Sequence, residues 1–210
     1  MFDISRPIES LKTSRKMFHS EADFQFALAW EIQRFFPEAK IRLEYCPTAL
    51  PNMHIDILVE LDNYLYPIEL KYKTLEIFMQ IDCESFNLKS HGAQDIGKYD
   101  CLFDIQRIEL FQGKLPRFHQ GFAVWLTNDP AYWSKPKRSN TIAEDFRLYD
   151  GTMKSGELAW ASHAGAGTTR NRTDSIKLVG SYTIEWKEYS KISNERNGSF
   201  RYAINRVGSD

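Results

Sequence analysis

The segment from residue 55 to residue 72 constrains the fold more than any other part of the chain. Two strand-like runs, residues 55–61 and 64–72, are separated by the turn pair Asp62-Asn63. Runs rich in β-branched and aromatic residues on either side of such a pair predict an antiparallel β-hairpin. The chain must therefore build a sheet in which these two strands are neighbours.

The register of this hairpin predicts a charged cluster. With a two-residue loop, Leu61 faces Tyr64, and Asp56 lies opposite Glu69. Lys71 shares the face of Glu69 because side chains repeat every second residue along a strand, and cross-strand Cβ atoms lie about 4.5–5.5 Å apart. A loop longer by two residues would pair Asp56 with Lys71 and keep the cluster. A slip of one residue would break it.

A helix is expected over residues 20–36. Ser20 and Asp23 form an S-x-x-D capping pattern, and Pro37 ends the run. At about 100° per residue, one apolar stripe forms, and Glu21 falls near its centre. A carboxylate in the first turn is also favoured by the helix dipole, which is the ordinary explanation for such a residue. The stripe consists of Phe24, Leu28, Ile32, Phe35 and Phe36.

Two other carboxylates have simpler interpretations. Glu31 lies at the edge of the apolar stripe, so we expect it on a solvated flank of the helix. Glu44 lies on a predicted strand over residues 41–45 and could face the charged cluster. Its alternation with Ile41 and Leu43 fits the polar face of a strand equally well.

The remaining patterns predict a mixed α/β fold. Residues 93–112 read as a helix, and residues 122–127 as a buried strand. The broad apolar face of that helix would hold Ile96, Tyr99, Leu102, Phe103 and Leu110. Later strand-like runs lie around residues 146–149, 158–160, 176–186 and 200–204.

Length and composition favour one soluble domain, residues 1–210. With 42% hydrophobic and 14% aromatic residues the chain is too rich in core-forming side chains to be disordered. No apolar run approaches the ~20 residues of a membrane-spanning helix. Its first residues lack a cationic stretch followed by an apolar block, so we expect a cytoplasmic protein without a secretory signal.

The three cysteines, Cys46, Cys83 and Cys101, are widely spaced and form no CxxC pair. This spacing favours buried, reduced thiols over a disulfide framework or a zinc site. Neither GxSxG nor the GKS/T ending of a phosphate-binding loop occurs in the sequence.

Charge is distributed unevenly along the chain. The net charge of −1 gives no global attraction to nucleic acid. Residues 135–210 nevertheless hold 13 basic and 9 acidic side chains, a net of +4, whereas residues 1–134 hold 14 and 19, a net of −5. Basic residues in the later part could contact phosphates, although scattered basic residues more commonly solubilise loops. The candidates are Lys135, Lys137, Arg138, Arg170 and Arg172 in two loops, together with Lys98 on the predicted helix.

The cluster of Asp56, Glu69 and Lys71 has a clear chemical use. Two adjacent carboxylates repel each other unless a cation lies between them. Mg²⁺ binds a few carboxylate oxygens and keeps positions for water and a phosphate. A nearby lysine can orient the attacking water and contact the phosphate. The arrangement therefore favours hydrolysis of phosphodiester bonds.

The pattern D-x12-E-L-K on two adjoining strands, preceded by a helix with an inward glutamate, resembles the PD-(D/E)XK nuclease superfamily. The resemblance covers residues 20–127 and implies a restriction-endonuclease-like core, a central mixed β-sheet flanked by helices. Residues 128–210 would be a β-rich C-terminal extension with basic loops. The resemblance also implies that Asp56, Glu69 and Glu21 bind Mg²⁺, with Mn²⁺ as a substitute, and that Lys71 assists the nucleophilic water.

Two positions depart from the pattern of this superfamily. Ile55 replaces the usual proline before the aspartate, which leaves the chemistry unchanged. Some branches carry a glutamine and a tyrosine four residues apart on the following helix. Here Gln94 is followed at that distance by Lys98, and Tyr99 comes one residue late. A specific exonuclease branch therefore cannot be assigned.

The resemblance implies a Mg²⁺-dependent nuclease, a hydrolase that acts on nucleic acid, with DNA favoured over RNA. Many members of the superfamily cut both strands as dimers, so a homodimer is an option, although the sequence shows no dimerisation surface. The alternative is a catalytically inactive module of the same fold that binds nucleic acid or a partner subunit. A third interpretation is a structural α/β protein in which the E-L-K triplet is accidental.

Overall fold

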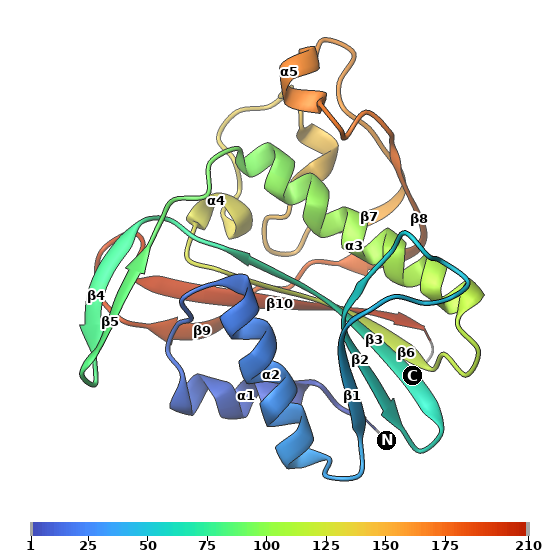
Figure 1. Cartoon of the computed structure of the whole chain (residues 1–210). Helices are drawn as coiled ribbons and strands as arrows, with labels where there is room; N and C mark the ends of the chain where they lie inside the picture. Colours follow the sequence, from blue (N-terminus) through green and yellow to red (C-terminus); the bar gives the residue numbers. More distant parts are fainter. Residues whose placement is uncertain (1, 209–210) are drawn as a thin grey trace.

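The computed structural model describes residues 2–208 as a mixed α/β fold (Figure 1). A six-stranded sheet forms its centre, with the strand order β1-β2-β3-β6-β10-β9. Within this described part, β3 and β6 are parallel, and the other neighbouring strands of the sheet are antiparallel. The strands are β1 (Lys40–Tyr45), β2 (Ile55–Leu61), β3 (Tyr64–Lys73), β6 (Gln120–Thr127), β10 (Ser199–Gly208) and β9 (Lys187–Lys191).

Helices cover both faces of the sheet. The helices α1 (Ser5–Ser14) and α2 (Glu21–Phe35) lie on one face, and α3 (Gln94–Lys114) lies on the other (Figure 1). Two hairpins and three short helices complete the fold. They are β4 (Ile77–Ile81) with β5 (Glu84–Leu88), β7 (Met153–Leu158) with β8 (Ile176–Thr183), α4 (Pro130–Trp133), α5 (Ala166–Thr169) and the 3-10 helix η1 (Glu144–Phe146).

The predicted hairpin and its register are confirmed. Leu61 pairs with Tyr64, and the antiparallel ladder continues to the pair Ile57 and Ile68. Asp62 and Asn63 have φ angles of 51° and 66°. Two successive residues with positive φ form the tight turn whose twist matches that of the flanking strands.

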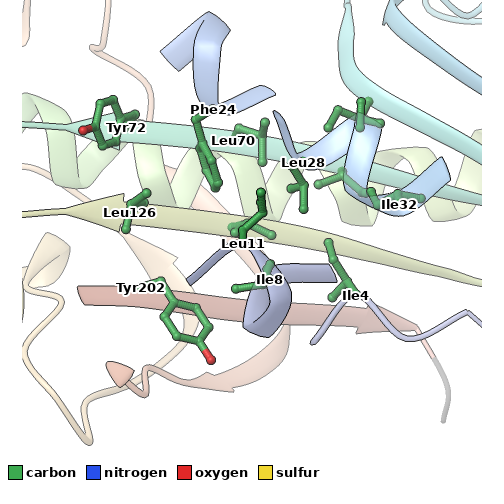
Figure 2. Close-up of a cluster of buried hydrophobic side chains, with 14 of the residues drawn as sticks. Ile4, Ile8, Leu11, Phe24, Leu28, Ile32, Leu70, Tyr72, Leu126 and Tyr202 are labelled. Carbon is green, nitrogen blue, oxygen red and sulfur yellow. The ribbon is translucent and has the colours of Figure 1, made fainter. Parts of the chain in front are cut away.

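The predicted helix over residues 20–36 is confirmed as α2. The side chain of Ser20 accepts a hydrogen bond from the Asp23 N–H at 3.1 Å, as the capping pattern requires. Figure 2 shows Phe24, Leu28 and Ile32 in one apolar cluster with Ile8 and Leu11 of α1. Full burial of one such apolar side chain is worth about 1.5–3 kcal/mol. Burial of these apolar faces holds α1 and α2 on the sheet.

The expectation for Glu31 is wrong. Its side chain is only 7% exposed and forms an ion pair with Arg34 at 2.9 Å. The carboxylate is tolerated because a cation one helical turn away compensates it.

The helix predicted over residues 93–112 is confirmed as α3, but its predicted inner face is only partly correct. Tyr99 and Leu102 are buried, whereas Phe103 and Leu110 are each 39% exposed. The sheet instead contacts another stripe of the helix, and the buried Asp104 interrupts the apolar pattern of that stripe. That stripe contains Cys101, Asp104, Ile105, Ile108 and Phe111.

The C-terminal part agrees less well with expectation. The strand predicted over residues 146–149 is wrong, because η1 ends at Phe146 and a loop follows, although Phe146 and Leu148 are buried in the core against α3. The strands expected near residues 176–186 and 200–204 are present as β8 and β10. Because β10 and β9 belong to the central sheet, residues 128–210 supply part of the sheet itself.

Two further observations concern the cysteines and the helices. Cys101 is a buried free thiol, whereas Cys46 and Cys83 are exposed, so the expectation of buried thiols is wrong for these two. Among residues 2–208, no helix has the length and apolar character needed to span a bilayer.

Candidate active site

The predicted site residues meet around the second half of β3. Asp56 lies one residue before the last ladder pair of β2, and its Oδ2 accepts a hydrogen bond from the Leu70 N–H at 2.6 Å. This bond joins the two strands where their ladder ends. Burial raises the pKa of Asp56, while the Leu70 N–H and the charge of Lys71 act in the opposite direction.

Glu21 contacts the same strand from α2, which lies on the other face of the sheet from α3. It is the first residue of α2, and its Oε2 accepts a hydrogen bond from the Tyr72 N–H at 2.7 Å. The negative charge of Glu21 acts to raise the pKa of both Asp56 and Lys71. The end of α2 is thereby tied to β3 beside these two residues.

Lys71 is held by α3. Its Nζ lies 2.8 Å from Asp104 Oδ2 and donates a hydrogen bond to the Leu70 carbonyl at 3.0 Å. Burial by itself would lower the pKa of Lys71, but the charges of Asp104 and Glu21 outweigh it and raise the pKa. Lys71 is therefore a stable ammonium and not a free base.

Glu69 is fully buried and faces a guanidinium. Arg107 Nη1 lies 3.0 Å from Glu69 Oε2 and 3.9 Å from Asp104 Oδ1, and the same guanidinium donates to the His54 carbonyl. Burial, followed by the charges of Asp104 and Asp56, raises the pKa of Glu69 well above its usual value. Burial therefore favours neutralisation of the Glu69 carboxylate, either by a nearby cation or by a proton.

Asp104 and Arg107 were missed by the sequence analysis. They lie three residues apart, which places both side chains on the face of α3 that meets β3. A count of charged residues along the same helical stripe as Cys101 and Ile108 would have found Asp104. Nothing in the local pattern indicates that Arg107 lies beside Glu69, because that contact depends on how α3 crosses the sheet.

These side chains lie on β3 or contact it, and we call them the charged cluster: Glu21, Asp56, Glu69, Lys71, Asp104 and Arg107. Four carboxyl groups stand against two cations, so the fully ionised cluster carries −2. This excess equals the charge of one divalent cation, and carboxylate oxygens are the donors that Mg²⁺ prefers. The donor chemistry therefore fits such an ion, although no three acidic, histidine or cysteine side chains between residues 2 and 208 are already grouped around one point.

A surface hollow opens beside Glu21. It has a volume of about 430 Å³ and lies between the start of α2, the end of β3 and the β4–β5 hairpin. Its lining includes Lys73, Lys89, His19 and His91. His91 is fixed by the Thr74 N–H, which donates to its Nδ1 at 3.0 Å. The lining of the hollow thus combines the carboxylate of Glu21 with the basic side chains of Lys73 and Lys89.

The structure separates the six predicted phosphate contacts into three groups. Lys98 and Arg138 line a second, smaller cavity. Arg172 forms two short contacts with Asp100, at 2.6 and 2.9 Å, so its guanidinium already has a partner. Lys135, Lys137 and Arg170 are exposed.

No protein-family model matches the chain, and no curated protein matches it. The candidate site therefore rests on the residues that the fold brings together at β3.

Proposed function

We propose that this protein is a metal-dependent nuclease that hydrolyses phosphodiester bonds in DNA, with a restriction-endonuclease-like core. The observation that carries the proposal is the charged cluster, in which Lys71 and Arg107 pair with Asp104 and Glu69 while Asp56 and Glu21 accept hydrogen bonds from neighbouring N–H groups of β3. The two excess negative charges of the fully ionised cluster favour uptake of a divalent cation.

The proposed roles follow from the position of each side chain. Asp56 and Glu69 would hold Mg²⁺ or Mn²⁺, with support from Glu21. Such a metal lowers the pKa of its bound water and neutralises charge on the phosphate. Lys71, as an ammonium, would contact a phosphate oxygen and orient the attacking water. Asp104 keeps that ammonium in place through the 2.8 Å contact.

The hollow beside Glu21 supports a polyanionic substrate. Lys73 and Lys89 in its lining would neutralise phosphates on the approach to the cluster. Each such contact releases counterions, so we expect binding to weaken with rising salt.

The alternative function is a catalytically inactive module that binds nucleic acid or a partner subunit. One observation favours it: Glu69 and Lys71 are already paired with Arg107 and Asp104 without any metal. Metal binding separates the two functions. A nuclease binds Mn²⁺ through Asp56, whereas a binding module need not.

The experiment compares wild-type protein with Lys71→Ala and Asp56→Ala on plasmid DNA, linear DNA and RNA, in Mg²⁺ and in Mn²⁺. We expect wild-type cleavage to exceed that of Lys71→Ala by roughly 10²–10³-fold, the usual cost of removing one electrostatic contact to the transition state. Lys114→Ala, an exposed lysine at the other end of α3, serves as the charge-matched control.

Manganese titration accompanies the cleavage assay. We expect wild-type protein to bind Mn²⁺ and Asp56→Ala to lose that binding. Equal cleavage by wild type and Lys71→Ala would contradict the proposal, as would the absence of both cleavage and Mn²⁺ binding in the wild type.

A further inference from the structure

A second cavity lies on the flank of α3, between that helix, α4 and the loop of residues 134–149. Its volume is about 160 Å³. At about 30 Å³ per water molecule this is room for roughly five waters, well below the 300–1,000 Å³ of pockets that enclose drug-sized ligands. The cavity therefore suits a small polar group and not a whole nucleotide. Its polar lining residues are Lys98, Ser134, Arg138, Thr141, Arg147 and Tyr149.

Arg147 gives the cavity a fixed cation. Its Nη1 pairs with Glu144 at 2.9 Å, and its Nη2 donates to the Arg138 carbonyl at 2.6 Å and to Thr141 Oγ1 at 3.3 Å. Only 15% of this side chain is exposed. A guanidinium held in this way is already ordered before any ligand arrives, which lowers the entropic cost of binding.

Lys98 and Arg138 bring further positive charge to the lining of the cavity. Lys98 Nζ lies over the ring of Tyr132 at 5.7 Å, and no ion pair joins it to any acid within residues 2–208. The nearby carboxylate of Asp129 accepts hydrogen bonds from the Ala131 N–H and from Gln94. The lining itself holds three cations, Lys98, Arg138 and Arg147, and no acid, while Glu144 next to Arg147 and the charges of Asp129 and Asp95 near Lys98 act from outside it.

The cavity lies close to the charged cluster along α3. Lys98 precedes Asp104 by six residues, which corresponds to about 9 Å along the helix axis. Successive nucleotides of one strand advance by about 3.4 Å along a duplex. For a strand that runs along α3 with its reacting phosphate at the cluster, the phosphate about three nucleotides away lies level with the cavity.

We propose that this cavity binds one backbone phosphate of a nucleic-acid strand and so positions the strand across the charged cluster. The proposal extends the nuclease function proposed above and adds a residue set, Lys98, Arg138 and Arg147, that is separate from the reacting groups. A phosphate there would accept hydrogen bonds from the cationic side chains and from the neighbouring hydroxyls.

The test measures DNA binding without cleavage. Fluorescence anisotropy with a labelled DNA oligonucleotide in EDTA, at several salt concentrations, is carried out on wild type, Lys98→Met and Arg138→Ala. Each variant should reduce the slope of log K against log salt by roughly 1 and weaken binding evenly across DNA sequences. Lys114→Ala is the matched control and should keep the wild-type slope. Arg138 is exposed, so its variant tests the cavity even if Lys98→Met disturbs α3.

The outcomes separate this proposal from the nuclease proposal. Wild-type slopes in both variants, or no DNA binding by wild type, would overturn the phosphate site. If DNA cleavage depends on Lys71 while both variants keep those slopes, the phosphate site alone is wrong. If the variants lose slope but no protein cleaves DNA, the site stands and the nuclease proposal falls.

A last arm tests whether the ligand is a small free phosphate. Inorganic phosphate is compared with chloride at equal ionic strength by thermal unfolding of wild type and Lys98→Met. Stabilisation of wild type alone, combined with unchanged DNA binding by Lys98→Met, would overturn the assignment to nucleic acid. If Lys98→Met loses both the stabilisation by phosphate and the binding of DNA, the assignment to nucleic acid is supported.

Discussion

At the scale of single residues, the pair of Glu69 and Arg107 places a charged group in the protein interior. A buried charge is tolerated only when a partner compensates it, and the loss of one partner leaves the other unpaired in a medium of low polarity. Glu69 is fully buried, and Arg107 is the cation nearest to its carboxylate.

We predict that Arg107→Ala lowers the free energy of unfolding by about 3–5 kcal/mol. Urea denaturation in metal-free buffer measures it. The double variant Glu69→Gln with Arg107→Leu should recover most of the loss because it removes both charges. An unfolding free energy of Arg107→Ala within about 0.5 kcal/mol of the wild-type value, the range of an ordinary surface substitution, would refute the prediction.

Asp104 gives a pH dependence whose sign can be derived. Burial, only partly offset by Lys71, raises the pKa of Asp104 to about 7 in the folded protein. In the unfolded chain an aspartate titrates near ~3.9. Between these values the folded protein holds a proton that the unfolded chain has released, so stability decreases as the pH rises through this window and levels off above it.

We therefore predict that the unfolding free energy of the metal-free protein falls from pH 4.5 to pH 7.5, and that Asp104→Asn shows a smaller fall. Urea midpoints at several pH values, in EDTA, check this. An identical pH profile for the two proteins would be inconsistent with a raised pKa at Asp104.

At the scale of elements, the start of α2 links helix capping to the candidate site. Ser20 accepts a hydrogen bond from the Asp23 N–H, and the next residue, Glu21, accepts the Tyr72 N–H of β3. Fraying of the first helical turn would loosen Glu21 as well.

Ser20→Ala should lower the unfolding free energy by about 1 kcal/mol, the typical cost of losing an N-cap. Ser20→Asp should retain most of the stability because aspartate also caps helices. Chemical denaturation of both variants provides the measurement. Wild-type stability of Ser20→Ala would show that the cap contributes nothing here.

The sequence predicted those elements whose specification is local. The turn pair at residues 62–63 determined the hairpin register, and the Ser20 cap determined where α2 begins. The inner face of α3 was predicted only in part, because the sheet and the β8 strand decide which side of that helix is buried. Asp104 and Arg107 were missed for the same reason.

At the scale of the whole molecule, the C-terminal residues complete the central sheet. β10 lies between β6 and β9, and its side chains Phe200 and Tyr202 are buried in the core beneath α1 and α2. Short, scattered patterns did not predict this arrangement, because strand pairing across a large sequence separation leaves no local signal.

We predict that the fragment of residues 20–127 does not fold by itself. It would expose the β6 edge that pairs with β10 and the apolar surface that α1 covers. Circular dichroism and denaturant titration of the fragment, beside the full chain, measure this. A cooperative unfolding transition in the fragment would contradict the prediction and would support a separate nuclease core.

The parallel pairing of β3 with β6 also determines the order in which the charged cluster can assemble. The connection between these strands, residues 74–119, carries α3 and therefore Asp104 and Arg107. The β2–β3 hairpin forms from neighbouring residues, whereas closing this long crossover costs chain entropy first and is intrinsically slow. We therefore expect Glu69 and Lys71 to stay hydrated until α3 docks, so that the charged cluster is completed only after the β2–β3 hairpin has formed.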